Sequence, residues 1–245
     1  MHLKHKFLAV LCTMKYRHLF FDLDHTLWDF DANARVTLES LYEGLQLKER
    51  GVHDFELFYR NYLVHNEKLW ERYRKGFIRQ DELRTKRMWL SLLDFKIADD
   101  ALSKAMSVQF LELLPTRTIL FPHAKEILQY LKDRNYQLHL ITNGFEKVQH
   151  SKLKYSGLDI FFEEVITSEG SNSLKPNKEI FDYALLKTGA TIADSIMLGD
   201  TLDADIQGAM NAGMDQVFVN HLGVTEMEIK PTYVVNSLKE LEQIF

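Results

Sequence analysis

The sequence of 245 residues lacks the features that define several classes of protein. It contains one cysteine, four prolines and eleven glycines. Cys12 has no second cysteine to pair with, so the chain is not a disulfide-stapled scaffold, and we expect a reducing compartment, the cytoplasm. The small numbers of prolines and glycines exclude collagen-like and low-complexity chains.

Motifs of several enzyme classes are also absent. The ten histidines show no zinc-ligand spacing such as HExxH. There is no GxSxG of a serine hydrolase, no Walker glycine-rich loop and no GxGxxG of a dinucleotide-binding fold. Any catalytic site therefore has to use other residues.

No hydrophobic run approaches the roughly 20 residues that are needed to cross a bilayer. Residues 7–12 are apolar, but this run is shorter than the roughly 7–15 residues at the centre of a secretory signal. We therefore expect residues 1–13 to be a disordered extension, and we expect no membrane partner.

The charge balance is mildly acidic. The 30 Lys and Arg residues against 35 Asp and Glu residues give a formal net charge of −5. Such a chain has no overall electrostatic attraction for a nucleic acid polymer or an anionic membrane, and only a local basic site is left open, so we expect no nucleic acid partner. Hydrophobic residues make up 46% of the chain, enough for a sizeable core. The sequence leaves the oligomeric state open.

Hydrophobic spacing divides the chain into two regions. An apolar run predicts a buried strand at 17–23, and helical spacing follows it. The expected helices of this first region are 32–47, 54–74, 79–94 and 98–114. After Pro115, strands are expected at 137–141, 163–167, 195–199, 216–219 and 232–235, and helices at 122–134, 145–156, 176–188, 203–212 and 237–244.

This order predicts an α/β fold, a Rossmann-like parallel-sheet core with an inserted all-helical cap domain. The strand at 17–23 has no parallel partner among the helices that follow it, so it must pair with strands beyond residue 135. We therefore predict that residues 14–28 and 116–245 form the core and that residues 29–115 form the cap.

Ligands of open parallel sheets bind at the carboxyl ends of the strands. The polar residues expected at these ends are Asp22, Asp24, Thr142, Asn143 and Asp200. Three carboxylates close together would repel one another unless a cation lay between them. Mg²⁺ suits oxygen ligands together with waters and a substrate phosphate, so we predict Mg²⁺ as the cofactor.

Hydrogen-bond donors for an anion are expected beside these carboxylates. Thr142, Asn143 and Lys175, which precedes a predicted helix, can hold a phosphoryl group. A metal, such donors and a free carboxylate are the components of a phosphoryl-transfer site. One carboxylate of the Asp22-x-Asp24 pair can attack phosphorus, and the other can protonate the leaving oxygen.

Each of these residues has an ordinary structural explanation when it is taken alone. Asp22 and Asp24 can be a turn acid and a helix cap, and Lys175 can be solvated. Thr142 can bond to the backbone, and Asp205 can interact with a helix dipole. Their combination at strand ends and loops favours a catalytic site.

The motifs Asp22-x-Asp24-x-Thr26, Thr142, Lys175-Pro176 and Gly199-Asp200 with Asp205 resemble, in this order, those of the haloacid dehalogenase-like superfamily of phosphohydrolases. The resemblance covers residues 17–245. It implies that Asp22 is the nucleophile and that Asp24 is the general acid/base. It also implies that Mg²⁺ is bound by the Asp22 carboxylate, the Asp24 backbone carbonyl and the Asp200 carboxylate.

The resemblance also implies roles for the surrounding residues. Thr142 and Lys175 would hold the phosphoryl group, and Thr26 and Asp205 would support the residues that contact metal and substrate. The second acid, Asp24, is typical of the phosphatases of this superfamily and not of its dehalogenases. The expected substrate is therefore a small phosphomonoester.

A narrower resemblance lies in Thr142-Asn143-Gly144-Phe145 and in residues 175–178, 180–185 and 237–242. These segments are similar to the bacterial pyrimidine 5′-nucleotidases, which implies UMP, dUMP, dTMP and noncanonical analogues as substrates. A sugar-phosphate phosphatase or phosphomutase of the same superfamily stays open as an alternative. A non-catalytic metabolite-binding or protein-interaction module is the alternative of another class.

Aromatic residues near the expected site are candidates for substrate specificity. These residues are Trp28, Phe30, Trp70, Tyr73 and Phe145. Each can instead belong to the apolar core, because aromatic side chains at helical spacing usually do.

Overall fold

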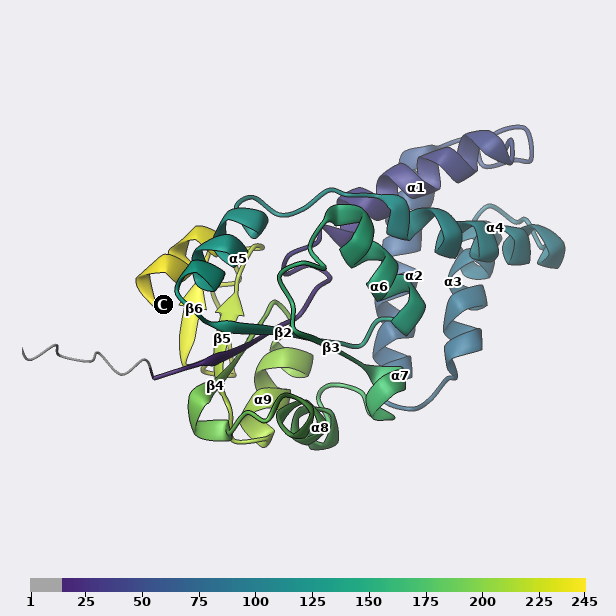
Figure 1. Cartoon of the computed structure of the whole chain (residues 1–245). Coiled ribbons are helices and arrows are strands. Elements are labelled where there is room, and N and C mark those ends of the chain that lie inside the picture. The colour runs from purple at the N-terminus through teal and green to yellow at the C-terminus, as the bar shows by residue number, and fades with distance from the viewer. Residues whose placement is uncertain (1–14) are drawn as a thin grey trace, which may run out of the picture.

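The computed structural model describes residues 15–245, so the disordered extension expected at 1–13 lies outside the described residues. A parallel sheet at one end carries helices on both faces, and a group of helices lies at the other end (Figure 1). The six strands have the order β3-β2-β1-β4-β5-β6. They are β1 His18–Phe21, β2 Gln137–Thr142, β3 Glu164–Thr167, β4 Ser195–Gly199, β5 Asp215–Val219 and β6 Tyr233–Val235.

The first strand lies in the middle of the sheet. It pairs in parallel with β2 on one side and with β4 on the other. The partners of β1 therefore come from beyond residue 135, and the predicted Rossmann-like parallel-sheet fold with an inserted helical region is confirmed. The exact domain boundaries stay a prediction.

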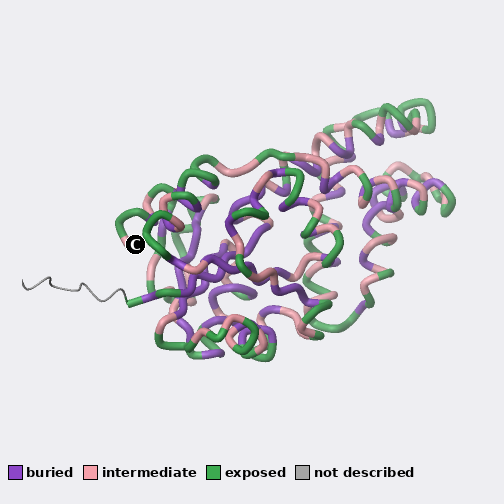
Figure 2. The backbone as a smooth tube through the Cα atoms, viewed as in Figure 1, coloured by how far each residue is buried: buried purple, intermediate pink, exposed green. Residues whose placement is uncertain are grey.

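Alternate residues of β1 serve the two faces of the sheet. Leu19 and Phe21 belong to a large apolar cluster, whereas Phe20 belongs to a second one. The helices that supply the first cluster include α5 Ala124–Asp133 and α6 Glu146–Ser156, and those that supply the second include α8 Lys178–Thr188 and α9 Gln207–Asn211. Buried residues accordingly run along the strands and along one side of each helix (Figure 2).

Four helices follow β1 and precede α5, after which the chain returns to the sheet at β2. They are α1 Phe30–Gly44, α2 Phe55–Arg74, α3 Gln80–Leu93 and α4 Asp100–Leu113. Asp29, Asp54 and Asp99 begin three of them, because each carboxylate accepts a hydrogen bond from a backbone N–H of the first turn. Phe58 and Phe110 of these helices share the apolar cluster of Leu19, so the insertion packs continuously with the sheet.

Some short elements differ from the sequence prediction. The expected helix at 203–212 begins as a π-helical turn, Leu202–Ile206, before α9. The expected terminal helix is a 3-10 helix, Leu238–Gln243. The structure adds α7 Ser168–Ser171 and the 3-10 turns Leu114–Thr116 and Ile192–Asp194. Hydrophobic periodicity could not resolve these differences, since a single turn of each helix type has similar spacing.

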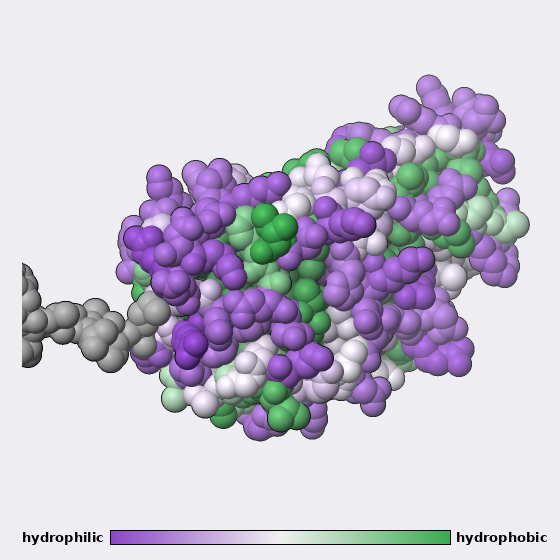
Figure 3. Space-filling view, viewed as in Figure 1, coloured by the Kyte–Doolittle hydropathy of each residue, from purple (hydrophilic) through white to green (hydrophobic). Residues whose placement is uncertain are grey.

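None of the helices in the described part of the chain combines the length and apolar character needed to span a bilayer. Hydrophilic side chains cover most of the face shown in Figure 3.

Two buried histidines face each other across β1 and β2. The rings of His18 and His139 stack with centroids 5.4 Å apart, and His18 Nδ1 lies 3.1 Å from His139 Nε2. Burial lowers the pKa of His139 to about 4, and His18 and Lys132 add to this shift. The pair is therefore stable in the core only while His139 is neutral.

We expect this histidine to make the fold sensitive to acid. In the unfolded chain His139 binds a proton below its ordinary pKa of 6.5. In the folded protein it binds that proton only near pH 4, because burial lowers its pKa. The stability that the neutral ring contributes is complete above pH 6.5 and falls as the pH drops toward 4, by on the order of 3 kcal/mol. Urea unfolding of the wild type and of His139→Phe across this range measures it. Parallel pH profiles of the two proteins would contradict the assignment.

Candidate active site

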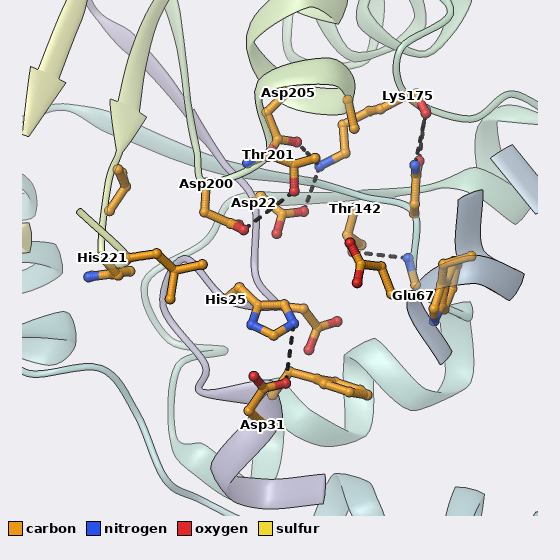
Figure 4. A pocket seen from close by; sticks show the side chains of 18 of the residues that line it. Asp22, His25, Asp31, Glu67, Thr142, Lys175, Asp200, Thr201, Asp205 and His221 are labelled. Atoms are coloured by element: carbon orange, nitrogen blue, oxygen red, sulfur yellow. Dashed lines mark hydrogen bonds and ion pairs between the residues drawn. The ribbon is translucent and has the colours of Figure 1, made fainter. Parts of the chain in front are cut away.

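The carboxyl ends of β1, β2 and β4 meet beside a cavity of about 510 Å³. Asp22 follows β1, Thr142 ends β2, and Asp200 follows β4. Since these strands are neighbours, residues far apart in the sequence converge in one place (Figure 4). The predicted catalytic, metal-binding and phosphate-binding residues that line the cavity are Asp22, Asp24, Thr142, Asn143, Lys175 and Asp200, and the predicted supporting residue Asp205 lines it too.

Lys175 lies at the centre of the polar cluster. Its ammonium group donates to Asp22 Oδ1 at 2.5 Å and lies 2.7 Å from Asp205 Oδ1. The lysine is only 2% exposed. Burial alone would lower its pKa, but Asp205 and Asp22 raise it above the ordinary value, so the side chain is a permanent cation.

The carboxylates around Lys175 are themselves shifted. Burial raises the pKa of Asp22 well above its ordinary value, with Lys175 opposing the shift and Asp205 adding to it. Burial and Asp205 raise the pKa of Asp200 to about 6. Thr26 donates to Asp200 Oδ1 at 2.8 Å, and the backbone N–H of Thr201 donates to Asp205 Oδ2 at 3.0 Å. These hydrogen bonds fix the two acids.

The donor set fits a divalent cation. One carboxylate oxygen from each of Asp22, Asp200 and Asp205 lies within 4.8 Å of the others. The Lys175 ammonium group pairs with Asp22 and Asp205 but not with Asp200, so three carboxylates and one cation leave an excess of negative charge in a largely buried place. Oxygen ligands with this excess charge suit Mg²⁺. The side chain of Asp24 lies outside this trio, so its predicted ligand atom, the backbone carbonyl, stays a prediction.

Thr142 and Asn143 bond to the protein at the end of β2. Thr142 Oγ1 accepts from the Gly144 N–H at 3.1 Å and from Gln149 Nε2 at 2.7 Å. The Asn143 amide donates to the Lys175 carbonyl at 2.9 Å and accepts from the Lys175 N–H at 2.8 Å. Asn143 therefore holds the backbone of Lys175 in place, and its predicted phosphate contact stays a prediction.

Gly144, which lies between Asn143 and α6, has no room for a side chain. A Cβ atom at Gly144 would lie 2.3 Å from Gln149 Cδ, closer than atoms can approach. The Asn-Gly sequence is thus a packing requirement as well as a turn.

The side chain of Asp24 is held by α6, which the sequence analysis did not foresee. Lys152 Nζ lies 2.6 Å from Asp24 Oδ1, and Gln149 Nε2 donates to Asp24 Oδ2 at 2.9 Å. Burial lowers the pKa of Lys152, and Asp24 opposes this shift. A signal was present, because Gln149, Lys152 and Ser156 share the inward stripe of α6 with Leu153.

Two of the five aromatic candidates for specificity, Phe30 and Trp70, line the cavity. The other three are not among the residues that line it. Trp28 is fully buried and donates from Nε1 to the Arg117 carbonyl at 3.2 Å, which joins the segment before α1 to the segment before α5. Trp28 therefore belongs to the apolar core, the alternative that the sequence analysis left open for it.

Phe145 and Tyr73 pack around Trp70. The Phe145 ring stacks on Trp70 with centroids 5.6 Å apart, and the Arg84 guanidinium lies 4.1 Å from the centre of the Phe145 ring. Tyr73 meets Trp70 edge-on at 5.7 Å. Phe145, which directly precedes α6, therefore packs against α2 and α3 and is buried there.

Further lining residues were missed by the sequence analysis. Leu63, Asn66, Glu67 and Arg74 from α2 line the cavity, because one side of this helix faces the strand ends. His25 lies 3.8 Å from Asp31 on the side of the pocket opposite Lys175 (Figure 4).

The chain resembles known proteins over almost all of its length. The pyrimidine 5′-nucleotidase PynA of Streptococcus pneumoniae is 35% identical over 234 residues, which cover 93% of this chain and 94% of PynA. The pyrimidine 5′-nucleotidase YjjG of Escherichia coli is 32% identical over 235 residues, which cover 94% of this chain and 98% of YjjG.

The fold also has a close counterpart among solved structures. The crystal structure of YfnB from Bacillus subtilis bound to magnesium matches with a TM-score of 0.83 at 28% identity, and the match covers 94% of this chain and 98% of YfnB. Residues 16–213 match the haloacid dehalogenase-like hydrolases. With the strand-end carboxylates and the buried lysine in one cavity, the chain belongs to the haloacid dehalogenase-like hydrolase family.

Proposed function

We propose that this protein is a Mg²⁺-dependent phosphomonoesterase that hydrolyses pyrimidine nucleoside monophosphates such as UMP, dUMP and dTMP. The observation that carries the proposal is the position of Asp22, which lies in the cavity with Lys175 on one oxygen and Asp200 close by. A carboxylate held in this way beside a second acid, Asp24, has the parts of a two-step phosphoryl transfer.

In the first step, a carboxylate oxygen of Asp22 attacks phosphorus and the bond to the leaving oxygen breaks. Asp24 acts as the general acid: it gives a proton to that oxygen and the nucleoside leaves. Lys175 and Thr142, which line the same cavity, would stabilise the negative phosphoryl oxygens. The product on the protein is a phosphoryl group on Asp22.

In the second step, Asp24, now ionised, removes a proton from a water molecule that attacks phosphorus. The bond between phosphorus and the Asp22 oxygen breaks, phosphate leaves, and both acids return to their starting states. Mg²⁺, held by Asp22, Asp200 and the Asp24 carbonyl, would supply the charge neutralisation that lets two anions meet.

The nucleotide substrate rests on two observations. The relatives PynA and YjjG are named as pyrimidine 5′-nucleotidases. The cavity, about 510 Å³, is within the range that holds a small ligand, and α2 lines it with the aromatic Trp70 and the amide of Asn66. An aromatic ring and an amide are groups that can contact a nucleobase.

A phosphate-release panel tests the substrate. We expect kcat/KM for UMP, dUMP and dTMP to exceed that for AMP and GMP by about tenfold or more, because a purine requires a larger pocket. Release should stop in EDTA and return with Mg²⁺. Equal rates with purines would overturn the pyrimidine assignment. A preference for a hexose phosphate would indicate a sugar-phosphate phosphatase, and its isomerisation without phosphate release would indicate a mutase.

A further inference from the structure

Two buried residues of α6, Lys152 and Gln149, contact the acid that the proposed mechanism uses twice. We propose that Lys152 and Gln149 are positioning residues that fix the carboxylate of Asp24 for proton transfer to the leaving group. The inference rests on the proposed phosphomonoesterase activity and adds a specific means of aiming its general acid/base.

The ammonium group of Lys152 lies among aromatic side chains where it pairs with Asp24. Its ammonium group lies 4.4 Å from the centre of the Trp28 ring and 5.7 Å from that of Phe30. The side chain is only 3% exposed, and its ion pair with Asp24 Oδ1 is 2.6 Å long. A buried ammonium group is costly unless it is paired, so this geometry specifies the position of the Asp24 oxygen closely.

Gln149 links Asp24 to Thr142, which is a predicted phosphate-binding residue. Its Nε2 group donates to Asp24 Oδ2 at 2.9 Å and to Thr142 Oγ1 at 2.7 Å. The glutamine is fully buried, and the absence of a Cβ at Gly144 makes room for it. One amide group therefore fixes the relative positions of the general acid/base and a predicted phosphoryl ligand.

The contacts leave Asp24 able to react. Each carboxylate oxygen can accept about two hydrogen bonds, and the structure gives each oxygen one donor from α6. A lone pair on each oxygen remains for the catalytic proton, and Asp24 lines the cavity. The role of α6 is thus to set direction without occupying the reactive site.

The test compares two leaving groups in Lys152→Met, a change that keeps most of the buried stem. UMP expels a basic alkoxide that needs the proton from Asp24, whereas 4-nitrophenyl phosphate expels a stable phenolate that does not. The value of kcat/KM reflects only the steps up to and including departure of the leaving group. It is therefore independent of the later attack of water on the phosphorylated Asp22. We expect kcat/KM to fall about 100-fold for UMP, and only a few-fold for 4-nitrophenyl phosphate.

Controls separate positioning from general damage. Lys154→Met, an exposed lysine of the same helix, should leave both substrates unchanged. Gln149→Leu provides a second variant should Lys152→Met not fold, and the same selective loss is expected. In an Asp24→Asn background, neither Lys152→Met nor Gln149→Leu should lower kcat/KM for UMP further, because the carboxyl group that these residues position is absent.

The outcomes are distinct. An equal fall for both substrates, or a full further loss in the Asp24→Asn background, would overturn the positioning role while leaving the proposed function intact. A wild-type protein that releases no phosphate from any monoester would overturn the proposed function, and the inference with it.

Discussion

Replacing Asp22 with asparagine is expected to lower kcat for UMP by about 10⁴-fold or more while the protein stays folded. The amide that results is a poor nucleophile, so the covalent step fails even though Lys175 and Thr142, the proposed phosphoryl ligands, are unchanged. Loss of this size is typical when a residue that bonds to the reacting atom is removed.

The folded state should tolerate this change. Burial raises the pKa of the Asp22 carboxyl, which means that its ionised form is costly in this place, and asparagine removes the charge with little change in volume. Lys175 keeps its ion pair with Asp205 at 2.7 Å. Steady-state kinetics together with the thermal midpoint check both parts, and turnover close to that of the wild type would exclude Asp22 as the nucleophile.

The polar residues of the site were predictable because short motifs at strand ends carry much of their own geometry. Asp22 and Asp200 each follow a buried apolar strand, and parallel neighbouring strands bring such positions to one edge of the sheet. No side-chain contact had to be known for this inference. The order of the strands then placed these acids beside one cavity.

Residues that depend on packing were not predictable in the same way. Lys152 is a lysine in a helix, which is usually solvated, and only the approach of α6 to Trp28 and Asp24 shows that it is buried. Phe145 follows the Asn-Gly turn and could have faced a ligand, but α2 and α3 come from the insertion and cover it. Sequence spacing describes one element at a time, and these roles arise between elements.

Replacing Lys175 with methionine is expected to damage both chemistry and stability. In the proposed mechanism Lys175 stabilises charge on the phosphoryl group, and loss of one such group costs about 10²–10³ in kcat. In the fold, the change leaves Asp22 and Asp205 facing each other without their ammonium partner. Breaking a buried ion pair in this way costs about 3–5 kcal/mol.

The stability loss should depend on pH in a direction that identifies its cause. Without Lys175, buried Asp22 loses the ion pair that opposes the upward shift of its pKa. Its folded pKa then stands even further above the unfolded value of 3.8, so the folded state binds the extra proton and is favoured as the pH falls. We therefore expect Lys175→Met to recover part of its lost stability as the pH is lowered from 8 to 5.

Urea unfolding at these pH values measures this recovery. Lys178→Met is the control, because Lys178 is an exposed lysine that pairs with Asp182 at 2.5 Å. A deficit that stays constant across this range would show that lost packing, and not the unpaired carboxylates, causes the instability.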